Sequence, residues 1–202
     1  MGRIAVDVVL LPEEAVRESA IELNAELVRR FGEKIVLNKG SCLPHISLAM
    51  GCIEESDIPA IEEILARIAS ETSLGDLSIV GISVTGNVKG EKVSCFEIER
   101  TKEVQSLHEK VMEELAIYFT SDVTEDMIYG DEEVAETTLQ WIKNYAKQSS
   151  FSNFYPHITI GYGEIKDQGF VRRFCACNLA LCHLGNHCTC RRIIASIGLK
   201  GR

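Results

Sequence analysis

Hydrophobic and polar positions alternate along the chain with periods that change several times. Residues 3–11, RIAVDVVLL, form a continuous apolar run, which is typical of a buried strand. Pro12 then begins an amphipathic helix that extends to about Phe31, with two glutamates in its first turn, and Gly32 ends it. Short apolar runs at 33–38 and 45–51 predict two further strands.

The rest of the chain mixes helical spacing with strand-like runs. Helices are expected at 55–72, 103–119 and 134–148, a short helix around 168–174, a hairpin over 77–99 that turns near 87–90, and strands at 178–185 and 189–199. This order predicts an α+β fold in which antiparallel sheets carry helices on their outer faces. Because no low-complexity linker interrupts it, we expect residues 1–202 to form a single bilobal unit around a central cleft.

Composition and charge narrow the function classes. The chain has 202 residues, 46% of them hydrophobic, which is enough for a substantial core. A formal net charge of -9 disfavours a broad electrostatic grip on nucleic-acid backbones. No run approaches the roughly 18 apolar residues of a membrane helix, and the first eleven residues resemble neither a signal peptide nor an anchor. We therefore expect a monomeric cytoplasmic protein without membrane contact.

The eight cysteines are unevenly distributed, with five of them between residues 175 and 190. Since nothing directs export, they are interpreted as reduced thiols without an obligatory disulfide. If the last two strands pair around Gly185, then Cys188 and Cys190 could approach Cys182 or His183, so a zinc site is the alternative interpretation. The Cys-x-Cys spacing differs from that of structural zinc sites, so no metal and no cofactor are predicted.

One tripeptide kernel occurs twice, in CLPHISLAMG at 42–51 and in FYPHITIGYG at 154–163. Residues two apart in a strand project from the same face, so His45 pairs with Ser47, and His157 pairs with Thr159. Two imidazoles that face one cleft suit phosphodiester chemistry, because one can accept a proton while the other donates one. The hydroxyl groups can hold phosphate oxygens. Unperturbed imidazole titrates near pH 6.5, so both forms would coexist near neutrality.

These residues resemble the two-histidine (2H) phosphoesterase superfamily, whose hallmark is one His-x-Thr/Ser motif in each lobe of a pseudo-symmetric α+β fold. HIS at 45–47 and HIT at 157–159 match that pattern. The resemblance implies catalytic His45 and His157, phosphate-binding Ser47 and Thr159, and activity on 2',3'-cyclic or 2',5'-linked nucleotide phosphates. Acidic GYGEIKD after the second motif departs from members that process RNA, so a small nucleotide or phosphoester is the expected substrate, with an RNA end as the alternative and ligase activity disfavoured.

Several further residues keep two interpretations. Tyr155 and Tyr162 flank the second motif and could either line the cleft or pack at strand ends. His183, His187 and one of Arg191 and Arg192 could contact a phosphate, because strand alternation lets only one of these arginines face inward. His108, among Glu and Lys, is predicted to be a solvated surface residue. A non-catalytic module that binds a nucleotide or RNA end in the same cleft is the alternative function.

Overall fold

The computed structural model describes residues 2–86, 90–165, 170 and 172–199. Its helices and strands follow one another in the order β1 (Arg3–Pro12), α1 (Glu14–Phe31), β2 (Ile46–Glu54), η1 (Glu55–Asp57), α2 (Ile58–Glu71), β3 (Asp76–Gly86), β4 (Lys92–Ile98), α3 (Lys102–Leu115), η2 (Glu125–Met127), α4 (Glu136–Gln148), η3 (Phe151–Asn153), β5 (His157–Tyr162), β6 (Arg173–Gly185), η4 (Asn186–Cys188) and β7 (Thr189–Gly198). The predicted α+β class is confirmed, and every pair of these strands is antiparallel.

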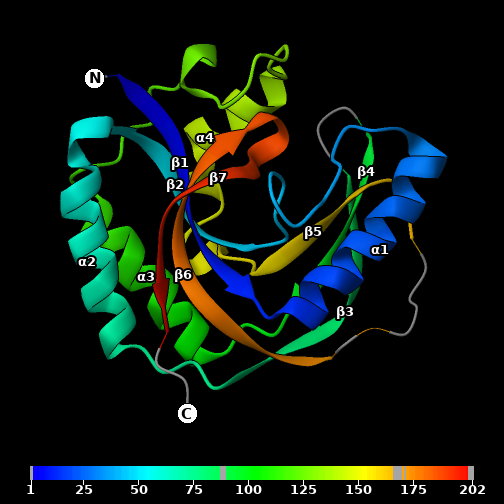
Figure 1. The fold of residues 1–202 in the computed structure, drawn as a ribbon, viewed down its shortest axis with the longest axis horizontal. Helices are drawn as coiled ribbons and strands as arrows, with labels where there is room; N and C mark the ends of the chain where they lie inside the picture. The colour runs from blue at the N-terminus through cyan, green and yellow to red at the C-terminus, as the bar shows by residue number, and fades with distance from the viewer. Residues whose placement is uncertain (1, 87–89, 166–169, 171, 200–202) are drawn as a thin grey trace.

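The strands form one sheet that returns upon itself. Their order is β1-β2-β5-β4-β3-β6-β7, and an additional pairing joins β1 to β6. The long β6 makes this closure because its first residues pair with β3 and its middle pairs with β1. In Figure 1, α2 and α3 lie on one side of the strands and α1 lies on the other. The two motif strands, β2 and β5, are adjacent within this arrangement.

Both faces of the central strand β1 are buried. Val6, Val8 and Leu10 belong to the main core beneath the helices. Val9 and Leu11 belong to a second, smaller apolar cluster that includes residues of the β6–β7 hairpin. This double burial explains why the strand is a continuous apolar run, since only strands covered on both faces lack polar alternation. Between Ile4 and Leu11, Asp7 is the single polar residue, and it has no exposed surface.

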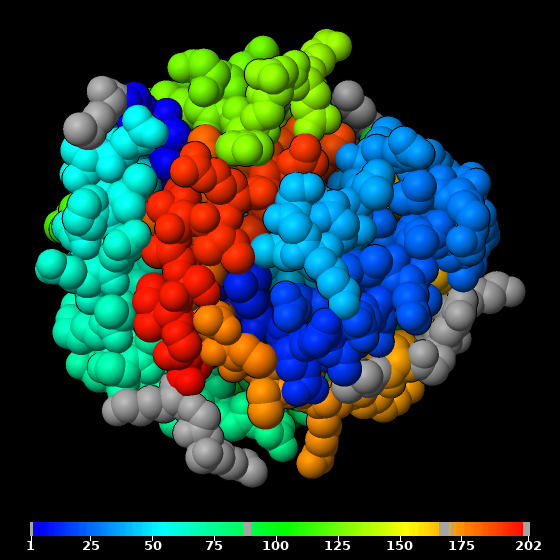
Figure 2. All heavy atoms as spheres, in the orientation of Figure 1, coloured from blue at the N-terminus to red at the C-terminus, as the bar shows by residue number. Residues whose placement is uncertain are grey.

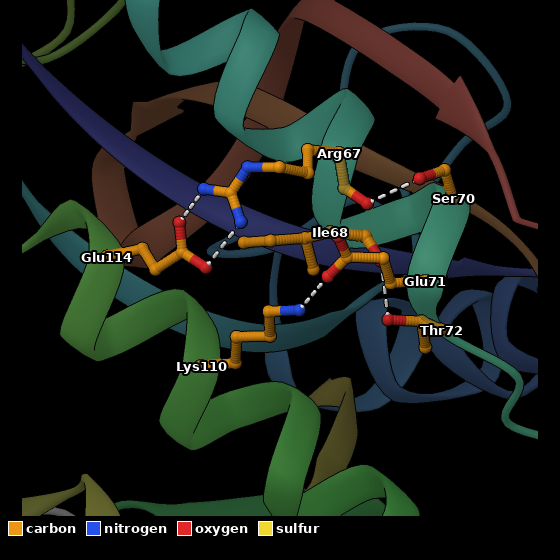
Figure 3. Close-up of polar contacts among 7 residues, drawn as sticks. All are labelled: Arg67, Ile68, Ser70, Glu71, Thr72, Lys110 and Glu114. Atoms are coloured by element: carbon orange, nitrogen blue, oxygen red, sulfur yellow. Dashed lines mark hydrogen bonds and ion pairs between the residues drawn. The ribbon is translucent and has the colours of Figure 1, made fainter.

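Helices α2 and α3 are fastened to each other at the surface (Figure 3). The guanidinium group of Arg67 on α2 contacts the carboxylate of Glu114 on α3, with Nη1 donating to Oε1 at 3.0 Å. Lys110 on α3 pairs with Glu71 at the end of α2. Apolar residues on the inner faces of the two helices, such as Ile61, Leu65 and Val111, are fully buried. Packing therefore supplies most of the attachment, because exposed ion pairs contribute only about 0–1 kcal/mol each.

Two predicted elements are wrong in part. No strand forms at 33–38, because the polar backbone atoms there bond to a side chain of α1: Asn24 Nδ2 donates to the carbonyl oxygen of Ile35 at 2.9 Å, and Leu37 N donates to Asn24 Oδ1 at 2.8 Å. Pro12 ends β1 rather than beginning the helix, which starts at Glu14.

Two predicted segments fall partly outside the described residues. Residues 168, 169 and 171 of the expected short helix at 168–174 lie there, and its last two residues belong to β6. The expected turn at 87–90 does so too, although β3 and β4 form the predicted hairpin.

The expectation of eight reduced thiols is also wrong. Cys182 on β6 and Cys190 on β7 form a disulfide, with 5.6 Å between their Cα atoms. Hairpin pairing brings the two residues together. Cys190 lies opposite Leu184, which is two residues from Cys182 on the same strand, so both cysteines lie on one face of the hairpin. The other six cysteines are free. Figure 2 shows the loop between α1 and β2 lying against this hairpin, where Leu43 N donates to the carbonyl oxygen of Cys190 at 3.1 Å.

No helix in the described part of the chain is both long and apolar enough to cross a membrane.

Candidate functional site

The two copies of the repeated kernel meet where β2 contacts β5. Ile46 pairs with Ile158 in an antiparallel register, and each of these residues directly follows a motif histidine. An antiparallel register through this pair places His45 opposite Thr159, and Ser47 opposite His157. Both isoleucines are fully buried and face the core. Since side chains alternate along a strand, all four motif side chains lie on the opposite face of the sheet.

That face is the floor of a cleft with a volume of about 290 Å³. His45, Ser47, His157 and Thr159 all line it. On an antiparallel pair, diagonal neighbours such as the two histidines have Cβ atoms about 7–8 Å apart or somewhat less. This spacing suits a phosphate group between the two rings. The structure therefore brings together the four residues that the sequence singles out.

The two imidazole rings are held in the same way. Nδ1 of His45 lies 2.7 Å from the carbonyl oxygen of Leu43, and Nδ1 of His157 lies 2.8 Å from the carbonyl oxygen of Tyr155. A carbonyl oxygen can only accept, so each neutral ring carries its proton on Nδ1. In both rings Nε2 is then the nitrogen that exchanges a proton. The repeat thus preserves the tautomer of each histidine as well as its position.

Burial makes both histidines harder to protonate. It lowers the pKa of His45 to about 4, with a smaller contribution from the nearby His157, although the Leu43 carbonyl acts in the opposite direction. Burial also lowers the pKa of His157. The sequence-based expectation of ordinary titration near pH 6.5 is therefore wrong, because desolvation disfavours the charged form. In the free protein both rings are neutral at pH 7.

The two hydroxyl groups, in contrast, have different partners. Ser47 Oγ donates to Oδ2 of the buried Asp7 at 2.6 Å. The same carboxyl oxygen lies 3.7 Å from Nε2 of His45. Thr159 instead receives a weak hydrogen bond from the Cys95 thiol, with Sγ and Oγ1 4.0 Å apart. The Thr159 hydroxyl keeps its own proton for another acceptor, whereas the Ser47 hydroxyl shares a short hydrogen bond with Asp7.

Helix α4, which the sequence predicted at 134–148, forms one wall of the cleft, and no sequence feature predicted that role. Thr138, Trp141 and Tyr145 line the cleft at helical spacing. Tyr145 is buried, but Trp141 is 48% exposed, and Tyr155 beside the second motif is 41% exposed. Two half-exposed aromatic side chains on a cleft provide flat surfaces on which a base could stack.

Both tyrosines near the second motif line the cleft, which decides between their two interpretations. The ring of Tyr155 stacks against that of His157 at 5.5 Å between centroids, and its hydroxyl donates to Ser83 Oγ at 3.0 Å. The hydroxyl group of Tyr162 lies 3.3 Å from Nδ1 of His187. Tyr155 therefore limits how the His157 ring can tilt.

The C-terminal hairpin contributes His187 but not His183. His187 lines the cleft from η4. His183 turns away from it, with Nε2 2.9 Å from the carbonyl oxygen of Met127. Arg191 borders an adjoining pocket and is partly buried, while Arg192 is exposed, as strand alternation predicts for such a pair.

His108 is not a solvated surface residue, so that prediction is wrong. It is fully buried. Its Nδ1 lies 2.7 Å from the Leu48 carbonyl oxygen on β2, and its Nε2 accepts from the backbone N–H of Phe151 at 2.7 Å. Its ring stacks on Phe154 at 3.9 Å. His108 thereby ties the segment before His157 to the strand that carries Ser47.

Charged groups are scarce in the cleft. Among the residues described there, none of those lining it is a lysine or an arginine. The described part of the chain also contains no group of three or more His, Cys, Asp or Glu side chains that could hold a metal ion. The imidazoles among the described lining residues are those of the two motif histidines and His187, and Asp7 lies beside His45.

Comparison with known proteins agrees with this geometry. A family model described as the 2'-5' RNA ligase superfamily matches residues 38–169, a range that includes both motifs. No curated protein sequence matches the chain.

Several solved structures share the fold across the whole chain. TT0787 of Thermus thermophilus is 17% identical, with a TM-score of 0.59 over 98% of this chain and 100% of its own. E. coli LigT complexed with phosphate is 12% identical, with a TM-score of 0.54 over 100% of both chains. E. coli LigT complexed with 3'-AMP is 11% identical, with a TM-score of 0.52 over 97% of this chain and 98% of its own. At these identities the likeness concerns the fold alone.

Proposed function

Because the chain belongs to the 2'-5' RNA ligase superfamily, we propose that it is a metal-independent phosphoesterase that hydrolyses a 2',3'-cyclic or 2',5'-linked nucleotide phosphate or a related small phosphoester. One observation carries the proposal. Two imidazoles from matching motifs line one cleft, and each has Nδ1 bonded to a backbone carbonyl, which leaves Nε2 for proton transfer.

The reaction needs one neutral and one protonated histidine. The neutral ring accepts a proton at Nε2 from a water molecule as the water oxygen forms a bond to phosphorus. The bond between phosphorus and the leaving ribose oxygen breaks, and that oxygen receives a proton from Nε2 of the other ring. The two imidazoles supply both proton transfers, so these steps need no metal ion. Thr159 donates a hydrogen bond to a phosphate oxygen.

Substrate binding supplies the required charge state. Both rings are neutral in the free protein because burial lowers their pKa values. An anionic phosphodiester placed between them favours protonation of one ring, since an opposite charge nearby stabilises the charged form. Substrate binding is therefore accompanied by protonation of one histidine. The positive charge of that ring balances the negative charge of the phosphodiester.

Three observations favour a small nucleotide over a polymer. A cleft of about 290 Å³ lies at the lower end of ligand-binding pockets, which are typically about 300–1,000 Å³. Trp141 and Tyr155 offer aromatic surfaces to a base. E. coli LigT, which shares the fold, has been solved with phosphate and with 3'-AMP. A single nucleotide matches all three.

The decisive test is hydrolysis of a panel of 2',3'-cyclic nucleotides, 2',5'-dinucleotides and cyclic ADP-ribose derivatives, with and without a chelator. We expect turnover of at least one cyclic or 2',5'-linked substrate, at a rate that the chelator does not change. Nucleotide binding without turnover would instead identify a non-catalytic binding module. Activity that the chelator abolishes would contradict the metal-independent scheme.

A further inference from the structure

Asp7 is the unusual residue of the otherwise apolar strand β1. Its side chain is fully buried, and Oδ1 has no hydrogen-bond partner of normal geometry among the described residues. Its other oxygen, Oδ2, contacts Ser47 at 2.6 Å and lies 3.7 Å from Nε2 of His45. A buried carboxylate with so few partners is costly, so this position must favour the neutral acid.

Among the residues that the structure describes, no permanent cation faces Asp7. The groups that face it are His45 on β2, Cys182 on β6, Tyr145 on α4 and Cys188 in η4. Cys182 is in the disulfide and does not titrate. Burial raises the pKa of Asp7 well above its usual range, and the Ser47 hydroxyl and the nearby Ala49 backbone N–H offset this only in part. The lowered pKa of His45 means that this imidazole is no counter-ion at neutral pH.

The charge of Asp7 decides what Ser47 can offer to an anion. When Asp7 is ionised, its carboxylate accepts a hydrogen bond from the Ser47 hydroxyl. Ser47 then presents only lone pairs to the cleft. When Asp7 is protonated, its own O–H can donate to Ser47 Oγ, and the Ser47 hydroxyl is free to donate to a phosphate oxygen. The ionised form would also repel an anion through its charge.

We propose that Asp7 is a positioning residue for the first half of the cleft: as a neutral carboxylic acid it turns the Ser47 hydroxyl outward, so that Ser47 donates to a phosphate oxygen. This inference rests on the proposed function in assuming that the cleft binds a phosphoester. The two motifs then bind phosphate differently. Thr159 can donate a hydrogen bond by itself, whereas Ser47 donates one only while Asp7 is protonated.

The test measures binding, so it does not depend on turnover. Dimethyl phosphate, a phosphodiester whose charge is constant over the pH range of interest, is titrated into the protein by NMR from pH 6 to pH 9. The Asp7 carboxyl carbon is followed in protein labelled with ¹³C-aspartate and assigned with Asp7→Asn. We expect Asp7 to be protonated at pH 7, and affinity to fall by about tenfold wherever its carboxyl ionises.

Two substitutions separate positioning from a merely structural role. Asp7→Asn stays neutral, and its amide can donate to Ser47, so it should retain affinity for dimethyl phosphate with no dependence on Asp7 ionisation. Asp7→Leu fills the space without a donor and should bind about tenfold more weakly. In a Ser47→Ala background the two variants should bind equally, since Asp7 acts through Ser47. Asp122→Asn, which removes an exposed carboxylate outside the cleft, is the charge control.

Three results would overturn the inference: an ionised Asp7 at pH 7 in protein that binds dimethyl phosphate, equal losses for Asn and Leu, or a Leu effect that persists without Ser47. If the wild-type protein binds dimethyl phosphate as expected but hydrolyses nothing in the substrate panel, the proposed function fails and the role of Asp7 stands.

Discussion

At the scale of single residues, the two motifs are alike in their histidines and unlike in their hydroxyls. Each imidazole has Nδ1 fixed by the carbonyl oxygen two residues earlier in the chain. The surroundings differ, because Asp7 lies behind Ser47, whereas a weakly bonding thiol lies beside Thr159. Near-symmetry of sequence therefore does not make the two histidines chemically equivalent, and the acid and the base can be told apart by experiment.

Replacing either motif histidine tests the division of proton transfer between them. We expect His45→Ala and His157→Ala each to lower kcat on a cyclic phosphate by about a hundredfold or more, the usual range for a lost proton-transfer group. The double variant should lose less than the product of the two factors, because residues that act as one unit are non-additive. Steady-state kinetics measure all three. Full activity of either single variant would contradict the scheme.

The pH dependence of kcat/KM follows from the shifted pKa values. The base is lost as pH falls below its pKa, and the acid is lost as pH rises above its own, so the maximum lies between the two. Burial places both below the ordinary value of 6.5, with His45 at about 4. We therefore expect a bell-shaped profile of kcat/KM with its optimum on the acid side of pH 6.5. An optimum above neutrality would show that burial does not govern these groups.

At the scale of elements, His108 on α3 joins two segments that carry the site. Its ring bonds to β2 on one side and to η3, which leads to His157, on the other. Phe151 there has a positive φ of 52°, a conformation that costs energy in a non-glycine residue. Arg100 also holds this segment through the carbonyl oxygens of Phe151 and Ser152. The turn before the second motif is thus stabilised from α3 and the end of β4.

Substituting His108 should loosen this connection. His108→Leu removes the buried ring nitrogens that bond to the Leu48 carbonyl oxygen and the Phe151 N–H, so we expect a loss of about 2–4 kcal/mol of unfolding free energy and slower turnover. His108→Gln can both donate and accept, and it should recover part of both losses. Chemical denaturation and kinetics measure them. Glu113→Gln, an exposed change on the same helix, is the control, and equal stability of all variants would refute the connection.

At the scale of the whole molecule, electrostatics favour a small substrate for the proposed function. The net charge is -9, and the described lining of the cleft contains no lysine or arginine. Affinity for a nucleic-acid backbone comes mainly from such cations and weakens with salt. A single nucleotide needs no such contacts, because one protonated histidine balances the charge of a phosphodiester.

We accordingly expect RNA that ends in a cyclic phosphate to be no better a substrate than the cyclic mononucleotide. The comparison is kcat/KM for a 2',3'-cyclic mononucleotide and for an oligonucleotide with the same 3' end, each at two salt concentrations. The mononucleotide value should depend little on salt. A much higher kcat/KM for the oligonucleotide at low salt, lost at high salt, would contradict this prediction. It would show that basic surface residues outside the cleft bind the RNA backbone.

Two features of the sequence point to buried polar residues. His108 lies four residues after Val104 and three before Val111, on the apolar stripe of its helix, so its burial follows from spacing even though its neighbours in sequence are charged. Asp7 is the lone carboxylate in a run that periodicity identifies as a buried strand. A polar residue at such a position needs a special reason to be there. In both cases the position in the hydrophobic pattern predicts burial, whereas the polar residue type by itself suggests exposure.

By itself the sequence determined most of the elements and the four motif side chains, because periodicity fixes which face of a helix or strand is apolar and alternation puts each histidine beside its hydroxyl. Only the tertiary structure decided what those side chains meet. The β2–β5 register opposes the motifs, and β1 places Asp7 behind Ser47, although 40 residues separate the two in sequence. The disulfide and the α4 wall depend on similar long-range packing. Local patterns report burial, whereas partners across a sheet and the desolvation that shifts a pKa exist only once distant strands have come together.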